Sequence, residues 1–316
     1  MTMLIEVVGS GELEEVHDLF IGTLGYESRS THLARKQLVN AKRKVALAFP
    51  NEDYVSYLAN RTFLSASDYY ILDNRRPIIA HLLQEMVEEH CNLSKVPVSV
   101  LIDISSMSRP MLADIIRLIA ELDAPHGVNA TFVYLPAAYV KGNAEHAPVA
   151  VSQPVTPEFA GWTSKPELPI TAVVGLGYEP DLALGALEFL EPTAAWAFIP
   201  TGEDRRYDDA VKEANRSLEV MLSDDRSMSY SVEEPARVHA VLETLVYGLV
   251  QRSRPILIPF GPKIFSLCCL LVAQNYAPSV TVWRVSGETL ARPGDRQASG
   301  KIVTMEVYFR PPISEE

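Results

Sequence analysis

Cysteine is scarce in this 316-residue sequence, which holds three. Cys91 stands alone, and Cys268 and Cys269 are neighbours inside an apolar run, so the spacing supports neither a disulfide framework nor a CxxC metal ladder. The histidines are scattered without the spacing of metal ligands. We therefore expect no disulfide and no metal site, and we expect the protein to reside in the reducing cytoplasm.

Long apolar segments are also missing. The longest run, residues 264–273, is too short to span a bilayer, and it contains Ser266. The first twenty residues lack a basic stretch followed by a long apolar one, so they do not have the pattern of a signal peptide. The sequence predicts a buried helix at 264–273 and no association with a membrane.

Positive charge is in deficit. The chain has 28 Lys and Arg against 40 Asp and Glu, a formal net charge of −12, and no block of basic residues. Binding along a long nucleic acid needs a basic stripe, so we do not expect it. A P-loop, an HExxH, a GxSxG and a complete GxGxxG are all absent, so no cofactor is expected. A small anionic ligand in a local positive pocket stays compatible with the composition.

What the sequence does have is an internal similarity. The tetrapeptide LGYE occurs at residues 24–27 and again at 176–179, an offset of 152 when taken at Gly25 and Gly177 (177 − 25). Three further strand-like pairs follow in the same order. Phe49 and Phe198 are 149 apart (198 − 49), Asp103 and Pro259 are 156 apart (259 − 103), and Thr131 and Thr281 are 150 apart (281 − 131). The common order predicts an internal duplication.

Each half alternates short β-branched runs with segments of helical spacing, which is typical of βα units and a largely parallel sheet. The apolar residues 112, 115, 116 and 119 share one face of a helix after Asp103. With 47% apolar residues the chain can bury two cores. The sequence thus predicts an α/β protein of two tandem Rossmann-like three-layer domains, at 1–155 and 168–316, joined by a linker at 156–167 that is rich in proline and turn formers.

Ligands of open parallel sheets bind beyond the carboxyl ends of the strands. The first turn of interest follows residue 24 and offers four candidate ligand-binding residues, Tyr26, Glu27, Ser28 and Arg29. Ser28 or Ser30 is alternatively a helix cap. The second half keeps Tyr178 and Glu179 but has Pro180 and Asp181 in place of the serine and the arginine.

The second turn lies between the run ending at residue 103 and the following helix. It supplies the candidates Asp103, Ser105, Ser106 and Arg109, more polar groups than one cap requires. Its counterpart in the second half carries Gly261 and Lys263, so a cation follows this strand in each half.

The order Asp, any residue, Ser, any three residues, Arg at Asp103, Ser105 and Arg109 resembles the post-strand motif of CARF domains, the CRISPR-associated Rossmann folds that sense cyclic oligoadenylates. Because CARF domains bind their ligand across the two-fold axis between two copies, a tandem duplication is similar to a single-chain version of that pair. The SAVED domain has a related fused arrangement. The second half departs from the motif, with Pro259 for the Asp and Gly261 for the Ser.

The resemblance implies a sensor in bacterial antiviral defence. The leading hypothesis is that a small anionic nucleotide binds in a cleft between the two halves and that a separate effector chain responds. The alternatives are a metal-independent ring nuclease, or a nucleotide enzyme with Glu27 as general base, and a non-catalytic interaction subunit of a larger complex. The polar residues are concentrated in the first half, so we expect mutations there to affect function more than matched changes after residue 168.

Overall fold

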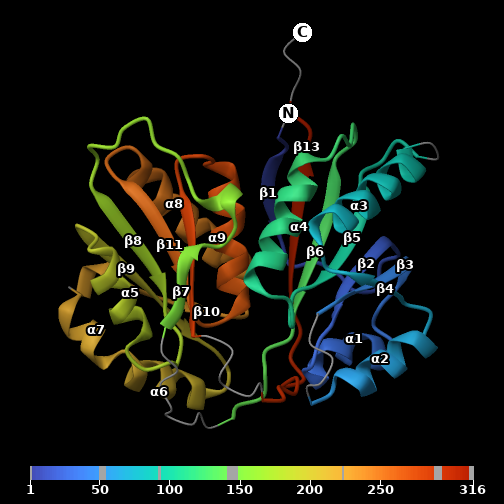
Figure 1. The fold of residues 1–316 in the computed structure, drawn as a ribbon, viewed down its shortest axis with the longest axis horizontal. Coiled ribbons are helices and arrows are strands. Elements are labelled where there is room, and N and C mark those ends of the chain that lie inside the picture. The colour runs from blue at the N-terminus through green and yellow to red at the C-terminus, as the bar shows by residue number, and fades with distance from the viewer. Residues whose placement is uncertain are drawn as a thin grey trace. The chain divides into compact units, whose positions relative to one another are not determined.

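The computed structural model describes residues 2–49, 55–91, 94–140, 149–222, 224–287 and 294–312. The chain forms two compact units. The first unit combines Met1–Ala138 with Pro293–Glu316, and the second is Tyr139–Arg292. Both are α/β units with mostly parallel sheets (Figure 1), which confirms the predicted α/β class and the largely parallel sheets.

The first unit has, among its described residues, a seven-stranded sheet of order β1-β13-β6-β5-β2-β3-β4. Five neighbouring strands are parallel, whereas β13 is antiparallel to β6 and β1 is antiparallel to β13. The strands are β1 (Leu4–Gly9), β2 (His17–Leu24), β3 (Ala41–Ala48), β4 (Tyr70–Asp73), β5 (Val98–Asp103), β6 (Val128–Tyr134) and β13 (Val303–Arg310).

The second unit has, within the described part of the chain, a six-stranded sheet of order β10-β9-β8-β11-β12-β7. The first five of these are parallel, and β7 is antiparallel to β12. The strands are β7 (Val149–Pro154), β8 (Ile170–Gly175), β9 (Ala194–Thr201), β10 (Ser227–Ser231), β11 (Arg254–Pro259) and β12 (Thr281–Gly287).

Helices pack on the sheet of the first unit. One core cluster joins Leu33 of α1 to Phe20 and Leu101 of the sheet, and another joins Tyr57 and Leu64 of α2 to Leu24. The apolar face of α4 is buried as its spacing predicts. The helices of this unit are η1 (Ser28–Thr31), α1 (His32–Arg35), α2 (Tyr57–Ala66), α3 (Arg76–Cys91) and α4 (Arg109–Glu121).

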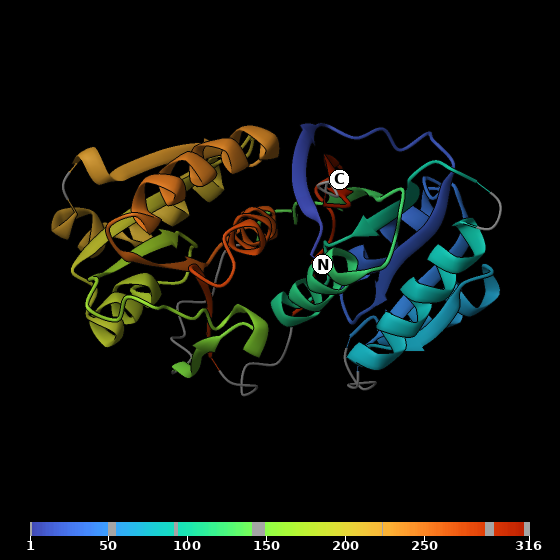
Figure 2. The ribbon, with the colours of Figure 1, turned by 90° about the horizontal axis from the view of Figure 1, so that it is seen from above.

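In the second unit α5, α6 and α7 bury Ala186, Val211 and Leu218 in one cluster with the sheet. The orange helix α8 and the red helix α9 lie side by side (Figure 2). Residues 264–274 of α9 are all buried, so the predicted buried helix is confirmed. The helices are η2 (Pro157–Phe159), α5 (Leu182–Leu190), α6 (Arg205–Ala214), α7 (Arg216–Met221), η3 (Asp224–Arg226), α8 (Pro235–Val250) and α9 (Lys263–Asn275).

The unit boundaries differ from the expected domains at 1–155 and 168–316. Strand β7, expected in the first domain, pairs with β12 of the second unit, and β13, expected in the second domain, pairs with β6 of the first. Periodicity identifies a strand but not the sheet edge that accepts it, because that choice depends on pairing between residues far apart in sequence. Each sheet is completed by a strand from the other half of the chain.

The expected linker at 156–167 belongs to the second unit. It contains η2, whose Phe159 is 3% exposed. The segment contacts the start of β12 and the residues before it: the Thr281 hydroxyl donates to the Ala160 carbonyl at 3.1 Å, and the Trp162 N–H donates to the Pro278 carbonyl at 2.6 Å. A proline-rich composition is typical of linkers. Here it instead marks an irregular segment held by backbone hydrogen bonds.

The two sheets share a strand order. Reading inward from the exchanged strand gives β13-β6-β5-β2-β3-β4 in the first and β7-β12-β11-β8-β9-β10 in the second. Val133 pairs with Thr304, and Trp283 pairs with Pro154. With the offset of 150 between residues 131 and 281, Val133 corresponds in sequence to Trp283, and their partners Thr304 and Pro154 are 150 apart as well (304 − 154).

Substituting Met305→Ala should destabilise the first unit, although residues 139–292 of the second unit separate it in sequence from the rest of that sheet. Met305 is 0% exposed in β13, and deleting a buried side chain of this size costs ~2–5 kcal/mol. Hydrogen exchange read by mass spectrometry should show faster exchange in β6 and not in β12. The control Val282→Ala, in β12, should give the reverse pattern, and faster exchange in β12 from Met305→Ala would contradict the strand exchange.

Candidate functional site

The turn after β2 is held by a buried ion pair. Arg29 is 7% exposed; its Nε lies 2.7 Å from Glu27 Oε2, and its guanidinium donates to the Leu135 carbonyl at 3.0 Å. Leu135 follows β6, so Arg29 ties the turn after β2 to the end of another strand of the same sheet. The cation that the sequence offered to a phosphate is thus engaged with protein partners.

Burial and charge act in opposite directions on this pair. Burial works to lower the pKa of the Arg29 guanidinium, but the neighbouring Glu27 carboxylate outweighs it, and the pKa lies above its ordinary value. Arg29 therefore stays charged. Removing one partner of a buried ion pair leaves the other uncompensated and costs ~3–5 kcal/mol.

The polar groups of the turn after β5 hydrogen-bond within the protein. Asp103 Oδ1 accepts from the Ser105 N–H at 2.9 Å, and Ser105 Oγ accepts from the Leu135 N–H at 2.8 Å. Ser108 is the N-cap of α4, with its Oγ 3.3 Å from the Met111 N–H. Asp103 and Ser105 are 3% and 0% exposed, so they shape the turn from inside.

The two turns form one polar edge of the first sheet. The Ser106 hydroxyl donates to Glu27 Oε2 at 3.2 Å, and Glu27 also accepts from Arg29. Arg109 is the half-buried first residue of α4, three positions beyond Ser106. Tyr26 is partly buried, and its ring packs against the cluster of Leu24 and Tyr57. The structure thus brings the candidates of the first half together at one edge.

Sequence reasoning missed an asparagine that organises this edge. Asn60 of α2 is 2% exposed, and its Nδ2 lies 3.0 Å from the Gly25 carbonyl, 2.9 Å from the Glu27 carbonyl and 3.0 Å from Ser30 Oγ. Neither Ser28 nor Ser30 caps η1, whose N-cap is Glu27 without a side-chain hydrogen bond. The cap interpretation of these serines is therefore wrong.

The second unit has a matching asparagine. Asn215, also 2% exposed, donates from Nδ2 to the Gly177 carbonyl at 2.7 Å and to the Val211 carbonyl at 2.8 Å. Gly25 and Gly177 are the glycines of the two LGYE segments. A signal was present in the sequence: residues 57, 60 and 64, and likewise 211, 215 and 218, share one helical face, so each asparagine is a polar residue in an apolar stripe.

The candidates of the second half are differently placed. Tyr178 packs against the core cluster, with its ring 5.9 Å from that of Tyr207, and Glu179 is exposed. Lys263 is the first residue of α9, as Arg109 is of α4. Asp181 stands where the first half has Arg29, so the buried ion pair has no counterpart at this turn. The expected asymmetry of polar side chains is present.

A segment before β13 lies across the turn after β2. Asp295 Oδ1 accepts from the Ser28 N–H at 2.7 Å, and the Arg296 carbonyl accepts from the Arg29 N–H at 3.2 Å and from Ser28 Oγ at 3.4 Å. No spacing in the sequence links residues 295 and 28, so this contact could not be predicted. We call residues 294–299 the strap.

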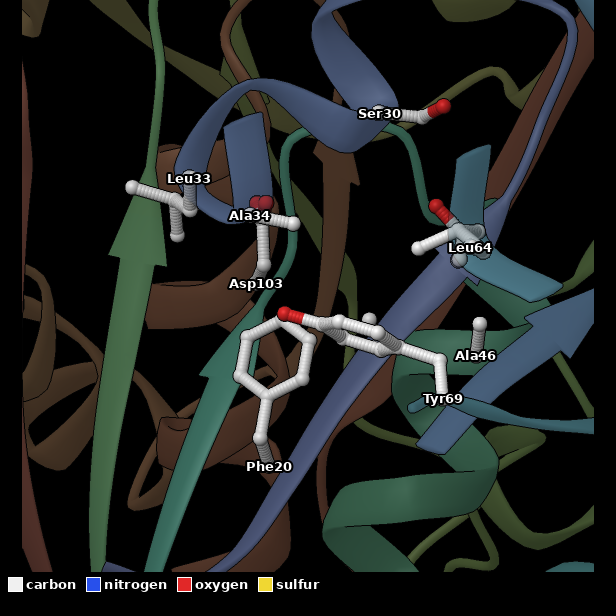
Figure 3. Close-up of a pocket in the computed structure, with 10 residues that line it drawn as sticks. Phe20, Ser30, Leu33, Ala34, Ala46, Leu64, Tyr69 and Asp103 are labelled. Carbon is white, nitrogen blue, oxygen red and sulfur yellow. The ribbon is translucent and has the colours of Figure 1, made fainter. Parts of the chain in front are cut away.

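A cavity lies beneath the turn (Figure 3). Ser30 from η1 and Asp103 from β5 line it together with the rings of Phe20 and Tyr69, which meet edge to face at 5.9 Å. Burial, and then the Asp103 carboxylate, raises the pKa of the Tyr69 hydroxyl to about 12, so this phenol stays neutral. The empty space is about 220 Å³ with its open side included, less than the ~300–1,000 Å³ of ligand pockets. A nucleotide therefore has no room inside it.

Within the described ranges, no group of three or more His, Cys, Asp or Glu side chains is arranged to hold a metal ion. In the same part of the chain, none of the helices reaches the length and hydropathy of a bilayer-spanning segment.

Comparison with known proteins gives no family. A scan against protein-family models found no match, and a search of curated proteins found no similar sequence.

Glu27→Gln should destabilise the first unit by about 3 kcal/mol, because it leaves the buried Arg29 without its counter-charge. The matched change Glu179→Gln, at the exposed residue of the second LGYE, should alter stability by less than about 0.5 kcal/mol. Hydrogen exchange in urea resolves the units separately. Equal effects of the two changes would contradict a structural role for the ion pair.

Proposed function

We propose that the protein binds a small anionic nucleotide at the carboxyl edge of the first sheet, as a sensor whose signal passes to a separate effector chain. The observation that carries the proposal is the hydrogen bond between Ser106 and Glu27. It joins the turn after β2 to the turn after β5, which makes one continuous polar surface of two adjacent strand ends, where ligands of open α/β sheets bind.

The residues divide into two groups under this proposal. Arg29, Asp103 and Ser105 are buried and hold the edge in shape. The side chains that would meet the ligand are those less deeply buried, Tyr26, Ser106 and Arg109. A tyrosine ring offers a stacking surface to a base, and an arginine at the start of α4 offers a phosphate contact.

Binding is favoured over catalysis by the hydrogen bonds of Glu27. Its carboxylate accepts hydrogen bonds from both Arg29 and Ser106. Both hydrogen bonds tie the Glu27 carboxylate to side chains of the same edge. Glu27 thus fits a positioning role better than proton transfer.

Thermal-shift measurements with cyclic and linear nucleotides test the proposal. A ligand at 100 times its Kd stabilises the folded state by about 2.7 kcal/mol, which raises the Tm of the unit that binds it. Arg109→Gln should abolish most of this shift. Arg117→Gln, further along the same helix and paired with Glu121 at 2.7 Å, is the matched control and should retain it. Stabilisation by no nucleotide, or a full shift in Arg109→Gln, would refute the proposal.

We also propose that the two units arose by duplication of one domain whose last strand was exchanged between copies. The common strand order, the single offset of 150 for both members of the exchanged pair, and the matched contacts of Asn60 and Asn215 with the glycine of each LGYE support this proposal. The CARF resemblance adds the expectation of a paired arrangement.

Expression of the chain as two separate fragments tests the proposed exchange of β7 and β13. Fragments 1–164 and 165–316, cut in an exposed turn, should copurify as a 1:1 complex when coexpressed, because β7 and β13 each belong to the other fragment's sheet. Size-exclusion chromatography with light scattering gives the stoichiometry. Two independently stable monomeric fragments would count against the exchanged origin.

A further inference from the structure

The strap lies on the turn after β2, which also carries Tyr26 of the surface assigned above to a ligand. It occupies the N–H of Ser28 through the Asp295 carboxylate and the N–H of Arg29 through the Arg296 carbonyl. The sequence indicates both Ser28 and Arg29 as candidate ligand-binding residues. In the structure the negative group beside this turn is the protein's own.

Hydrogen bonds rather than apolar burial hold the strap down. The Gln297 carbonyl accepts from the Ala138 N–H at 2.8 Å, and the Ser299 N–H donates to the Pro136 carbonyl at 2.9 Å. Ala298 packs on a core cluster, but the strap has no large apolar side chain, and Gln297 and Ser299 are exposed. Segments with few buried apolar contacts open at low free-energy cost.

The ends of the strap favour movement of the segment as a whole. Gly294 begins it, and Gly300 follows it with φ = 95°, a conformation that glycine adopts without strain. Beyond Gly300 the chain enters β13, which is anchored on both sides in the sheet. Opening can therefore stop at Gly300 without disturbing the sheet.

We propose that the strap is an autoinhibitory contact in which the Asp295 carboxylate occupies the position of the ligand's anionic group. This inference rests on the proposed nucleotide binding. Asp295 is the only carboxylate in residues 294–301. A second negative group brought to the same turn is repelled by it in this half-buried setting, so ligand binding requires the strap to lift.

Two substitutions weaken the hydrogen bond between Asp295 and the Ser28 N–H by different amounts. Asp295→Asn keeps the shape but replaces a charge-assisted hydrogen bond with a neutral one, and Asp295→Ala removes the acceptor. Amide exchange at Ser28 should accelerate by about tenfold in the first and further in the second. Asp123→Asn, at an exposed residue of the same unit, makes the same change in net charge and should leave exchange at Ser28 unaltered.

Binding is then measured by calorimetry with ATP, a cyclic triadenylate and inorganic pyrophosphate as probes. We expect at least one probe to bind about tenfold more tightly to Asp295→Asn than to the unaltered protein or to Asp123→Asn, and more tightly again to Asp295→Ala. Equal affinities in all four proteins, with exchange at Ser28 accelerated, would overturn the autoinhibitory role and leave nucleotide binding standing. Absence of binding in every protein, with the strap opened, would overturn the proposed function itself. Unchanged exchange in both Asp295 variants would overturn the strap as a latch.

Discussion

The pairing of β13 with β6 is the constraint on which the first unit depends. It closes a loop of 171 residues (304 − 133) between Val133 and Thr304, and it gives β1 its partner in the sheet. The entropic cost of closing a loop grows slowly with its length, so a long detour through another unit is tolerated. Because β13 arrives along the sheet edge beside β6, the strap that precedes it is delivered to the carboxyl end of the sheet, where the polar edge lies.

The polar edge is organised by groups that face inward. Asn60 donates to backbone carbonyls, Arg29 donates to a carboxylate and a backbone carbonyl, and Ser105 accepts from a backbone N–H. These buried side chains therefore have hydrogen-bond partners. Polar networks of this kind rigidify a site when every member has its partner. The second unit keeps the asparagine on its glycine turn but lacks the arginine, so its turn relies on fewer ties.

Local patterns predicted much of this structure. The apolar stripes of α4 and α9, the alternating β and α segments and the parallel character of the sheets follow from side-chain periodicity, and each is present. The candidate residues of the first half lie together because strand ends and helix starts meet at one edge of such folds. Periodicity could not predict which distant residues contact each other. The exchange of β7 and β13, the Arg29 contact with Leu135 and the Asp295 contact with Ser28 all join residues 106 or more positions apart. Such pairings are decided by which edges the folded sheets present.

The exchange of strands also fixes an order of events during synthesis. Ribosomes add roughly 5–20 residues per second, so the 176 residues between the end of β6 and the end of β13 (310 − 134) take roughly 9–35 s to make. Throughout that interval the edge of β6 that β13 covers is unpaired, and β1 lacks its partner strand. All six strands described for the sheet of the second unit are made within the same interval, before β13. An open strand edge is a template for pairing with other nascent chains. The unit whose translation begins first is therefore the unit whose sheet is completed last.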